Sequence, residues 1–513
     1  MTASTMTLTP STGHTRSVLG AGAVAETPDT AGLVHRASQP GYDRWLRHIA
    51  SAAGCRYPIR LAGRTTSADP STGEVTADLD TAHMPDGVLY TACGNRRASV
   101  CPHCAETYRA DTYHLVHAGL LGGKGVPDTV TDHPTVFLTL AAPSFGAVHT
   151  AHKSGKPCHP RRDPHVCEHG IEFSCLRRHE TGDDYAGRPF CLDCYDHQAQ
   201  VVFNAYAGEL WRYTSQNMRR EVDRLGKRYG VKLRVSYAKV AEFQARGVVH
   251  FHALVRLDGV DPLDPDCITP PDPRLHVAYF EHALRQAAET TSYRTPAHPE
   301  RPDGWLLSWG ERSIDTRQVR LTVRDLDDNG ALTDTAVAGY LAKYATKATE
   351  TTGHLSRRLT HDTVGYYADM NTHPGRLITA AWYIGQLPDG IARLDENVDE
   401  RIAFQKAWAG LHRWAHQLGF GGHFSTKSRR YSTTLATLRA ARRNWKRQQA
   451  HAEDYPDKTV QPGDEPDILT IGHLTFAGIG WHTTADAQLA NTAAAKAREH
   501  RHTVKEEATE QPF

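Results

Sequence analysis

The chain has 513 residues, 39% of them hydrophobic and 23% charged, as in an ordinary globular protein of roughly two to four domains. Its formal net charge of +1 excludes a global field that would draw it onto nucleic acid or an anionic membrane, so any DNA-binding charge must be local. No apolar run is long enough to span a bilayer and no signal peptide is evident. We therefore expect no membrane partner, a cytoplasmic location and ten reduced cysteines.

The predicted elements begin after a tail rich in Thr, Ser, Gly and Ala, which we expect to be disordered over residues 1–40. Apolar periodicity, β-branched runs and capping residues then predict helices and strands in alternation, and mostly helix beyond about residue 395. This mixture indicates an α+β or α/β protein. In chain order we expect a helix over 42–53, a strand over 134–140, a long helix over 198–227, strands over 232–243 and 248–257, a helix over 276–290, strand signals over 306–323 and a helix over 334–350.

The sharpest motif is His250-Phe251-His252, inside a strand-like run. Alternate side chains of a strand share a face, so both imidazoles can hold one divalent cation. If residues 245–247 form a three-residue hairpin loop with glycine at its left-handed position, Glu242 lies opposite His250 and supplies a third ligand. Gln244 remains an alternative third ligand. Two imidazoles and a carboxylate suit Mg²⁺ or Mn²⁺, although a histidine pair of this kind also occurs in strands without a metal.

A second motif lies in the helix expected over 334–350. Tyr340 and Tyr344 are four residues apart and share a helix face, and Lys343 and Lys347 flank it. A phenol is a weak nucleophile near its ordinary pKa of about 10. A metal that polarises a phosphate, with lysines nearby, makes its attack feasible, and two tyrosines allow two successive strand transfers. Taken alone, the same pattern also fits a packed amphipathic helix.

The two motifs together resemble the HUH endonuclease superfamily. Several stretches are more closely similar to the replication initiator proteins of actinomycete plasmids and integrative conjugative elements, over roughly residues 50–450. These are CGNRRASVCPHC at 93–104, VFLTLAAPSFGAVH at 136–149, VAEFQARGVVHFHALVRLDG at 240–259, AVAGYLAKYATKATE at 336–350 and FGGHFSTKSRRYSTTLATLR at 420–439.

The resemblance implies an HUH core, a five-stranded antiparallel sheet with flanking helices. It makes His250 and His252 metal ligands, Glu242 or Gln244 the third, and Tyr344 or Tyr340 the nucleophile that becomes linked to a 5′ phosphate at a plasmid origin. The strand at 136–140 would be the first motif, although Ala141 stands where a second hydroxyl residue is common. Origin DNA, single-stranded or as a hairpin, and a host polymerase are the implied partners. A host helicase is expected because no phosphate-binding Gly-x4-Gly-Lys loop is present.

Nine of the ten cysteines fall into two groups, each with a Cys-x2-Cys pair suited to tetrahedral zinc. We expect two structural zinc sites, with His103 and His114 as less favoured ligands of the first and with Cys158, His159, His169 and His179 as spare or unrelated. The polar segment around the second site has too little apolar content to fold without a metal. The two predicted ligand sets are Cys55, Cys93, Cys101 and Cys104, and Cys167, Cys175, Cys191 and Cys194.

From residue 427 to 447 the chain has eight Lys or Arg and no acidic residue. Helical spacing places several of them on one stripe suited to DNA phosphates, and Tyr431 and Trp445 are candidates to stack on bases. A solvated basic helix is the alternative. The predicted DNA-binding residues are Lys427, Arg429, Arg430, Arg439, Arg442, Arg443 and Lys446.

These predictions divide the chain into a tail at 1–40, a zinc-binding N-terminal module at 41–125 and an endonuclease domain at 126–352 with a zinc-binding insertion at about 155–197. A helical basic region at 353–455 and a linker with a small segment at 456–513 follow. Two other functions remain open. One is a conjugative relaxase or single-strand transposase with the same chemistry, and the other is a zinc-dependent DNA-binding regulator without catalysis.

Overall fold

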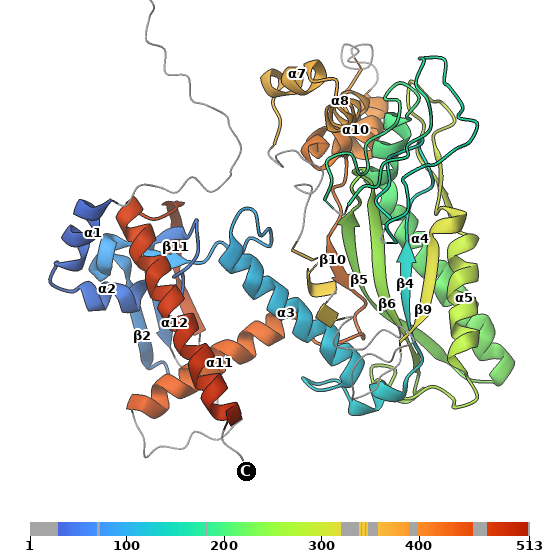
Figure 1. Ribbon diagram of the computed structural model, residues 1–513. Coiled ribbons are helices and arrows are strands. Elements are labelled where there is room, and N and C mark those ends of the chain that lie inside the picture. Colours follow the sequence, from blue (N-terminus) through green and yellow to red (C-terminus); the bar gives the residue numbers. More distant parts are fainter. Residues whose placement is uncertain are drawn as a thin grey trace, which may run out of the picture.

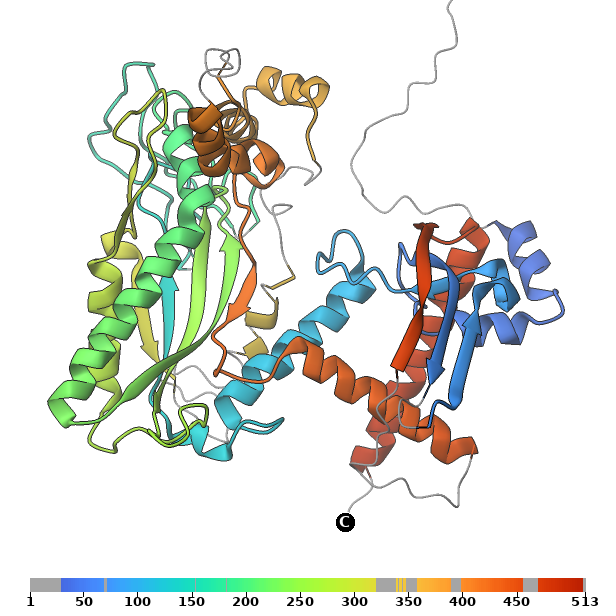
Figure 2. The same ribbon diagram turned by 180° about the vertical axis from the view of Figure 1, so that it is seen from behind.

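A computed structural model describes residues 29–68, 72–152, 154–180, 182–319, 338–339, 341–343, 345–346, 358–388, 398–454 and 469–510. Figures 1 and 2 show two lobes that are joined by helices α3 and α11. Helices and antiparallel sheets are combined throughout, which confirms the predicted α+β class. None of the helices in these ranges is long and apolar enough to cross a lipid bilayer.

The larger lobe contains a five-stranded antiparallel sheet with the strand order β10-β5-β6-β4-β9. The strands predicted around the histidine motif and at 134–140 form its three central members. A two-stranded ribbon of β7 and β8 lies beside it. The strands of this lobe are β4 (Thr135–Leu140), β5 (Leu233–Phe243), β6 (Val249–Gly259), β7 (Ser292–Arg294), β8 (Leu306–Ser308), β9 (Ile314–Gln318) and β10 (Ser425–Lys427).

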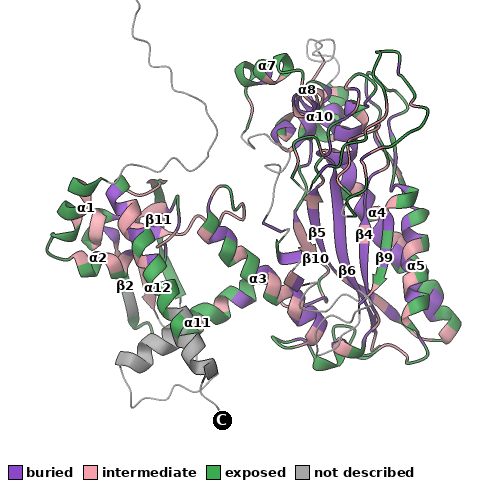
Figure 3. Ribbon diagram, in the orientation of Figure 1, coloured by how far each residue is buried: buried purple, intermediate pink, exposed green. Residues whose placement is uncertain are grey.

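One face of this sheet packs against helices and forms the main core, seen as buried strands in Figure 3. The longest helix, α4 (His197–Tyr229), begins where the Asp196 carboxylate accepts a hydrogen bond from the Ala199 amide and ends at Gly230 in a left-handed conformation. Phe251 of β6 meets Trp211 of α4 edge to face, 6.0 Å between ring centroids. The other helices of this lobe are α5 (Val277–Glu289), α7 (His361–Asp369), α8 (His373–Ile384) and α10 (Val398–Arg413).

The opposite face carries the histidines and is covered differently. A smaller apolar cluster there joins α3 (Pro102–Leu121), three strand residues and three residues that come later in the chain. The strand residues are Phe137, Val240 and Leu254, and the later residues are Ala338, Leu341 and Ala345. Further along the same face a charged group replaces apolar packing: Asp258 and Arg256 have no exposed side-chain surface. Asp258 accepts hydrogen bonds from His133 Nδ1 at 2.8 Å, Arg256 Nε at 2.7 Å and Ser236 Oγ at 2.6 Å.

Although burial opposes its ionisation, the hydrogen bonds from His133 and Arg256 hold the pKa of Asp258 below its ordinary value. An Asp258→Ala variant leaves Arg256 buried without its partner, so we expect a loss of about 3–5 kcal/mol in the free energy of unfolding at neutral pH. In the wild type this stabilisation is present above the unfolded pKa near ~3.9 and is lost as the pH falls through the lower folded value. Urea unfolding measures both effects. Exposed Asp223 on α4 gives the control variant, Asp223→Ala, which should change little, and an equal effect of both substitutions would contradict the prediction.

The smaller lobe combines the two ends of the described chain. Its four-stranded sheet has β11 (Leu469–Ile479) antiparallel to β1 (Ile59–Ala68), with β2 (Val75–Asp80) and β3 (Leu89–Thr91) also paired to β1. Arg36 in α1 (Thr30–Ala37) bridges Asp86 at 3.0 Å and Asp486 of α12 (Thr484–Glu510) at 2.6 Å. Trp45 and Ile49 of α2 (Tyr42–Ile49) fill a small core with residues of α12.

The domain boundaries expected from the sequence therefore need correction. Residues 469–510 are not a separate small segment but complete the N-terminal module, because β1 takes β11 as its neighbour and α12 covers the core. Residues 358–454 are likewise divided: α7, α8 and α10 belong to the core of the larger lobe, β10 extends its sheet, and α11 (Leu435–Asp454) contacts α3. Helix α1 also falls within the predicted disordered tail, whose residues 1–28 lie outside the described ranges.

Candidate active site and metal centres

The hairpin of β5 and β6 has the register expected from its glycine. The Gly247 amide donates to the Gln244 carbonyl at 2.8 Å, Gly247 has a φ of +77°, and Glu242 pairs with His250. As a result Glu242, His250 and His252 lie on one face. His250 Nε2 is 2.8 Å from His252 Nε2, and Glu242 Oε2 is 3.6 Å and 3.7 Å from these two atoms. Gln244 is directed elsewhere, since its side-chain oxygen accepts from Arg246 Nε.

This geometry fits one divalent cation. Ligands bound at about 2.1 Å and at right angles lie about 3.0 Å apart, close to the separations found here. Burial, aided by neighbouring His252 and Arg246, lowers the pKa of His250 to about 3, which keeps its imidazole neutral and its lone pair free for a metal. Thr139 Oγ1 lies 3.0 Å from His252 Nδ1 and orients that ring, and Phe137 stacks on it at 5.5 Å. Glu242, His250 and His252 could hold Mg²⁺ or Mn²⁺ with positions left for phosphate oxygens.

The segment with the paired tyrosines is described in part. Tyr340, Tyr344 and Lys347 lie outside the described residues, whereas Ala338, Leu341 and Ala345 are fully buried on the histidine face of the sheet. Lys343 is exposed.

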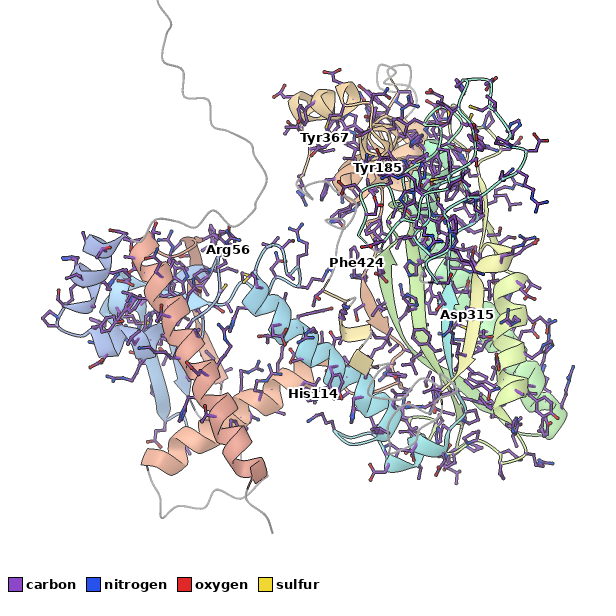
Figure 4. The ribbon with its side chains drawn as sticks, viewed as in Figure 1. Arg56, His114, Tyr185, Asp315, Tyr367 and Phe424 are labelled. Atoms are coloured by element: carbon purple, nitrogen blue, oxygen red, sulfur yellow. The ribbon has the colours of Figure 1, made fainter. Side chains whose placement is uncertain are left out.

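The loop between Cys93 and Cys101 contacts this segment. The Ala98 amide donates to the Thr346 carbonyl at 3.4 Å, and Arg96 Nη1 donates to the Ala345 carbonyl at 3.2 Å. The Arg96 guanidinium also lies over the ring of Phe424, 3.7 Å from its centroid, at the position labelled in Figure 4. These hydrogen bonds link the loop of the first cysteine group to Ala345 and Thr346, next to the histidine face of the sheet.

That first group contains the four predicted cysteines, Cys55, Cys93, Cys101 and Cys104. Three of their Sγ–Sγ distances are 3.6, 3.7 and 3.9 Å, far from the ~2.05 Å of a disulfide and close to the ~3.8 Å edge of a zinc tetrahedron with ~2.3 Å bonds. The hydrogen bond with the Cys55 thiol is the main reason that the pKa of Cys104 falls to about 5, against the effect of burial. His103 and His114 are not among the ligands of this group.

The second predicted cysteine set is wrong in one member. Cys167, Cys191 and Cys194 come together with His169, while Cys175 lies in a third group with His149, Cys158 and His179. The Cys-x2-Cys spacing predicted sites made of cysteines alone. Histidine ligands have no comparable spacing signal in a chain with 31 histidines, so His169 was not recognised as a ligand. The insertion consequently offers two groups of ligands, and the described residues offer three cysteine-containing groups in place of two.

The predicted basic stretch is partly engaged inside the protein. Arg439 and Arg442 of α11 both form ion pairs with Asp111, which is buried in α3. Lys427 Nζ donates to carbonyls, most closely that of Ser432 at 2.7 Å, and Arg430 pairs with Asp266. These four side chains therefore hold the fold in addition to any contact with phosphates.

The remaining members of the stretch differ in exposure. Arg429 and Arg443 are exposed, and Lys446 falls within α11. Trp445 is 56% exposed and remains available for stacking on a base. Tyr431 is fully buried, so the expectation that it stacks on a base is wrong: its hydroxyl donates to the Val116 carbonyl at 3.2 Å.

A basic pocket was missed in the sequence. Its lining combines three arginines with an indole and amides: Asn95, Arg96, Arg97, Arg358, Trp414, His416 and Gln417. Guanidinium groups suit phosphates and an indole suits bases, so this pocket can take a strand of nucleic acid. The signal available was the Asn-Arg-Arg run inside the first cysteine loop, but the other side of the pocket comes from residues more than 250 positions later.

Together these features define an α+β protein with a two-histidine, one-carboxylate site on an antiparallel sheet and cysteine–histidine groups suited to metals. The chain belongs to the family described as "Replication initiator protein, pSAM2", whose model matches residues 41–495. A replication initiator protein of Streptomyces ambofaciens is 40% identical over 500 residues, which cover 94% of this chain and 97% of that protein. No solved structure is significantly similar to the chain. The resemblance to actinomycete replication initiators is confirmed.

Proposed function

We propose that the chain initiates rolling-circle replication as a metal-dependent tyrosine endonuclease of the HUH class, which nicks and rejoins one strand at an origin. The observation that best supports this proposal is that Glu242, His250 and His252 come together on one face of a five-stranded antiparallel sheet. Ala338, Leu341 and Ala345, which neighbour the two tyrosines in the sequence, belong to the apolar cluster on that face.

In the proposed reaction the phenol oxygen of Tyr344 or Tyr340 attacks the scissile phosphorus. The phenol releases its proton to solvent as its oxygen bonds to phosphorus, and the bond from phosphorus to the 3′ oxygen breaks. The phosphate remains on the tyrosine as a 5′-phosphotyrosyl ester, and the 3′ oxygen takes up one proton from solvent and leaves as a hydroxyl. Glu242, His250 and His252 would hold Mg²⁺ or Mn²⁺, which would polarise that phosphate, and Lys343 and Lys347 neutralise charge that builds up on it. The free 3′ hydroxyl then primes a host polymerase, and the other tyrosine can accept the strand at the end of a round.

The first cysteine group has a supporting role in this proposal. Zinc held by Cys55, Cys93, Cys101 and Cys104 fixes the loop from which Arg96 and Ala98 hydrogen-bond to residues 345 and 346. Four thiolates leave no open coordination position, so this zinc is structural.

Origin DNA is the proposed partner. The basic pocket at Arg96, Arg97 and Arg358 and the exposed Arg429 and Arg443 give local positive charge to a chain whose net charge is near zero. Trp414 in the pocket can stack on an unpaired base. In this proposal a host helicase unwinds the origin DNA.

The decisive test uses full-length protein with Mn²⁺ and labelled single-stranded origin DNA. A covalent DNA–protein adduct is expected on a denaturing gel for the wild type and none for the Tyr340→Phe/Tyr344→Phe double variant, and the single variants identify the tyrosine that cuts first. Tyr366 of α7 is 67% exposed, and Tyr366→Phe is the matched control that should form the adduct normally. Origin binding without any metal-dependent nick would instead support a zinc-dependent DNA-binding regulator.

A further inference from the structure

The insertion between β4 and α4 contains eight cysteine and histidine residues that could bind metal ions, arranged in four successive pairs. In chain order the pairs are His149 and Cys158, Cys167 and His169, Cys175 and His179, Cys191 and Cys194. The first and third pairs converge in one group, and the second and fourth pairs converge in the other. We propose that residues 149–194 form a cross-braced module that binds two zinc ions, one at a Cys2His2 site and one at a Cys3His site.

The Cys2His2 site has the separations that tetrahedral zinc requires. Cys158 Sγ is 3.7 Å from His149 Nδ1, and Cys175 Sγ is 3.5 Å from His179 Nε2. Zinc with bonds of about 2.3 Å to sulfur and about 2.05 Å to nitrogen places these atoms about 3.6 Å apart. All four ligand atoms lie within 4.8 Å of one another.

Groups around this site orient its ligands. His179 Nδ1 donates to Asp183 Oδ2 at 2.8 Å, which directs Nε2 toward Cys175 in the arrangement typical of zinc-binding histidines. The backbone amide of Thr150 donates to Cys158 Sγ at 3.1 Å, as expected for a sulfur that carries negative charge. His149 stacks on Phe190 with ring centroids 4.2 Å apart.

The Cys3His site is built on a tight turn and on the start of α4. His169 Nδ1 lies 3.3 Å from Cys194 Sγ, 3.6 Å from Cys191 Sγ and 4.0 Å from Cys167 Sγ. The Gly170 amide donates to the Cys167 carbonyl at 2.9 Å, and Gly170 has the left-handed φ of +75° that this turn requires. The last ligand, Cys194, precedes the Asp196 cap of α4 by two residues.

The module has little else to hold it together. Its described residues form no helix or strand, and the buried side chains among them are the ligands Cys158, Cys167, His179 and Cys191 with Pro189. An apolar core is therefore replaced by the ligands themselves, the situation in which metal binding supplies the folding free energy. Tyr185, labelled in Figure 4, marks this loop-rich part above the sheet.

The module also contacts the hairpin with the active-site ligands. The His149 amide donates to the Arg188 carbonyl and the Gly187 amide donates to the His149 carbonyl, both at 2.8 Å. Gly187 in turn lies against the hairpin loop: a Cβ there would meet the Ala245 carbonyl carbon and the Arg246 nitrogen at 2.5 Å. The Cys2His2 site thus supports the loop that joins Glu242 to His250.

Native mass spectrometry of the full-length protein purified with zinc tests the proposal by counting ions per chain. Cys175→Ser and Cys191→Ser should each lose one zinc ion relative to the wild type, and the double variant should lose two. Cys267 is exposed and belongs to no metal-binding group among the described residues, so Cys267→Ser is the matched control that should lose none. A double variant that loses only one ion would show that both cysteines serve one site and would overturn the cross-brace.

A second pair of variants guards against misfolding. His179→Cys keeps a zinc ligand and should retain the wild-type count, whereas His179→Ala should lose one ion. Loss of an ion in neither of these variants, or in both, would contradict the assigned Cys2His2 site. The zinc count does not depend on nicking, so its outcome is distinct from that of the adduct test.

Discussion

Replacement of His252 with alanine is expected to reduce formation of the DNA–protein adduct by at least about 100-fold under single-turnover conditions with Mn²⁺. A metal that polarises the scissile phosphate contributes several kcal/mol, and each ~1.4 kcal/mol corresponds to tenfold in rate. Because His252 Nε2 lies 2.8 Å from His250 Nε2 and 3.7 Å from Glu242 Oε2, its loss leaves the two other ligands unable to hold the ion well. Origin binding, measured by fluorescence anisotropy, should change little because the arginines remain.

A graded variant separates metal binding from folding. Thr139→Val removes the hydroxyl at 3.0 Å from His252 Nδ1 and should weaken Mn²⁺ binding by roughly 10–100-fold, with the rate recovering at high Mn²⁺. His282 on α5 is exposed and belongs to the helical side of the sheet, so His282→Ala is the matched control. Adduct formation by His252→Ala within about threefold of the wild type would show that the ion is held elsewhere.

The second large effect concerns stability. Lys239 of β5 is only 5% exposed, and its Nζ lies 3.8 Å from the ring centroid of Phe251 and 5.6 Å from that of Trp211. Burial lowers the pKa of Lys239 to about 7. In the unfolded chain a lysine has a pKa near ~10.4, so between these values the unfolded state binds a proton that the folded state does not.

The buried lysine therefore lowers the free energy of unfolding progressively as the pH falls from about 10 to about 7. Below pH 7 the free energy stays lowered by the full amount. A shift of about 3.5 pH units corresponds to at most about 5 kcal/mol at ~1.4 kcal/mol per unit. Lys239→Met should therefore raise the free energy of unfolding by about 2–5 kcal/mol at pH 6 and by much less at pH 10.

Urea unfolding followed by tryptophan fluorescence at pH 6, 8 and 10 measures this gain. Lys232 is exposed and directly precedes β5, and Lys232→Met provides a control with little effect expected at any of these values. A Lys239→Met variant less stable than the wild type at pH 6, or a gain that does not vary with pH, would contradict the prediction.

Local signals in the sequence predicted the centre of the larger lobe well. The glycine at 247 alone favoured a three-residue loop for the hairpin. That register places Glu242 opposite His250, as the structure has it. The long helix α4 and the strand β4 followed from periodicity and β-branched residues in the same way. Each of these inferences needed only a short window of residues.

Long-range pairings could not be predicted in this way. Nothing in Ile59–Ala68 identifies Leu469–Ile479 as its neighbour, because the backbone groups on the open side of a strand can pair with any strand of suitable length. The attachment of Arg439 and Arg442 to Asp111 likewise depends on where α11 meets α3. The exchange of Cys175 for His169 arose because loops of different length can bring the same ligand types together.

The pairing of β1 with β11 has a consequence for the order in which the protein can be built. A ribosome releases the first ligand of the Cys55 group hundreds of residues before it releases Trp481, whose indole donates to the Cys55 carbonyl at 2.9 Å. The larger lobe can fold while synthesis continues, but β1 of the N-terminal lobe keeps an unpaired edge until β11 has been synthesised. Because β11 and α12 complete the N-terminal lobe, a chain terminated before residue 469 would have the larger lobe's sheet, with its histidines, beside an unfinished lobe.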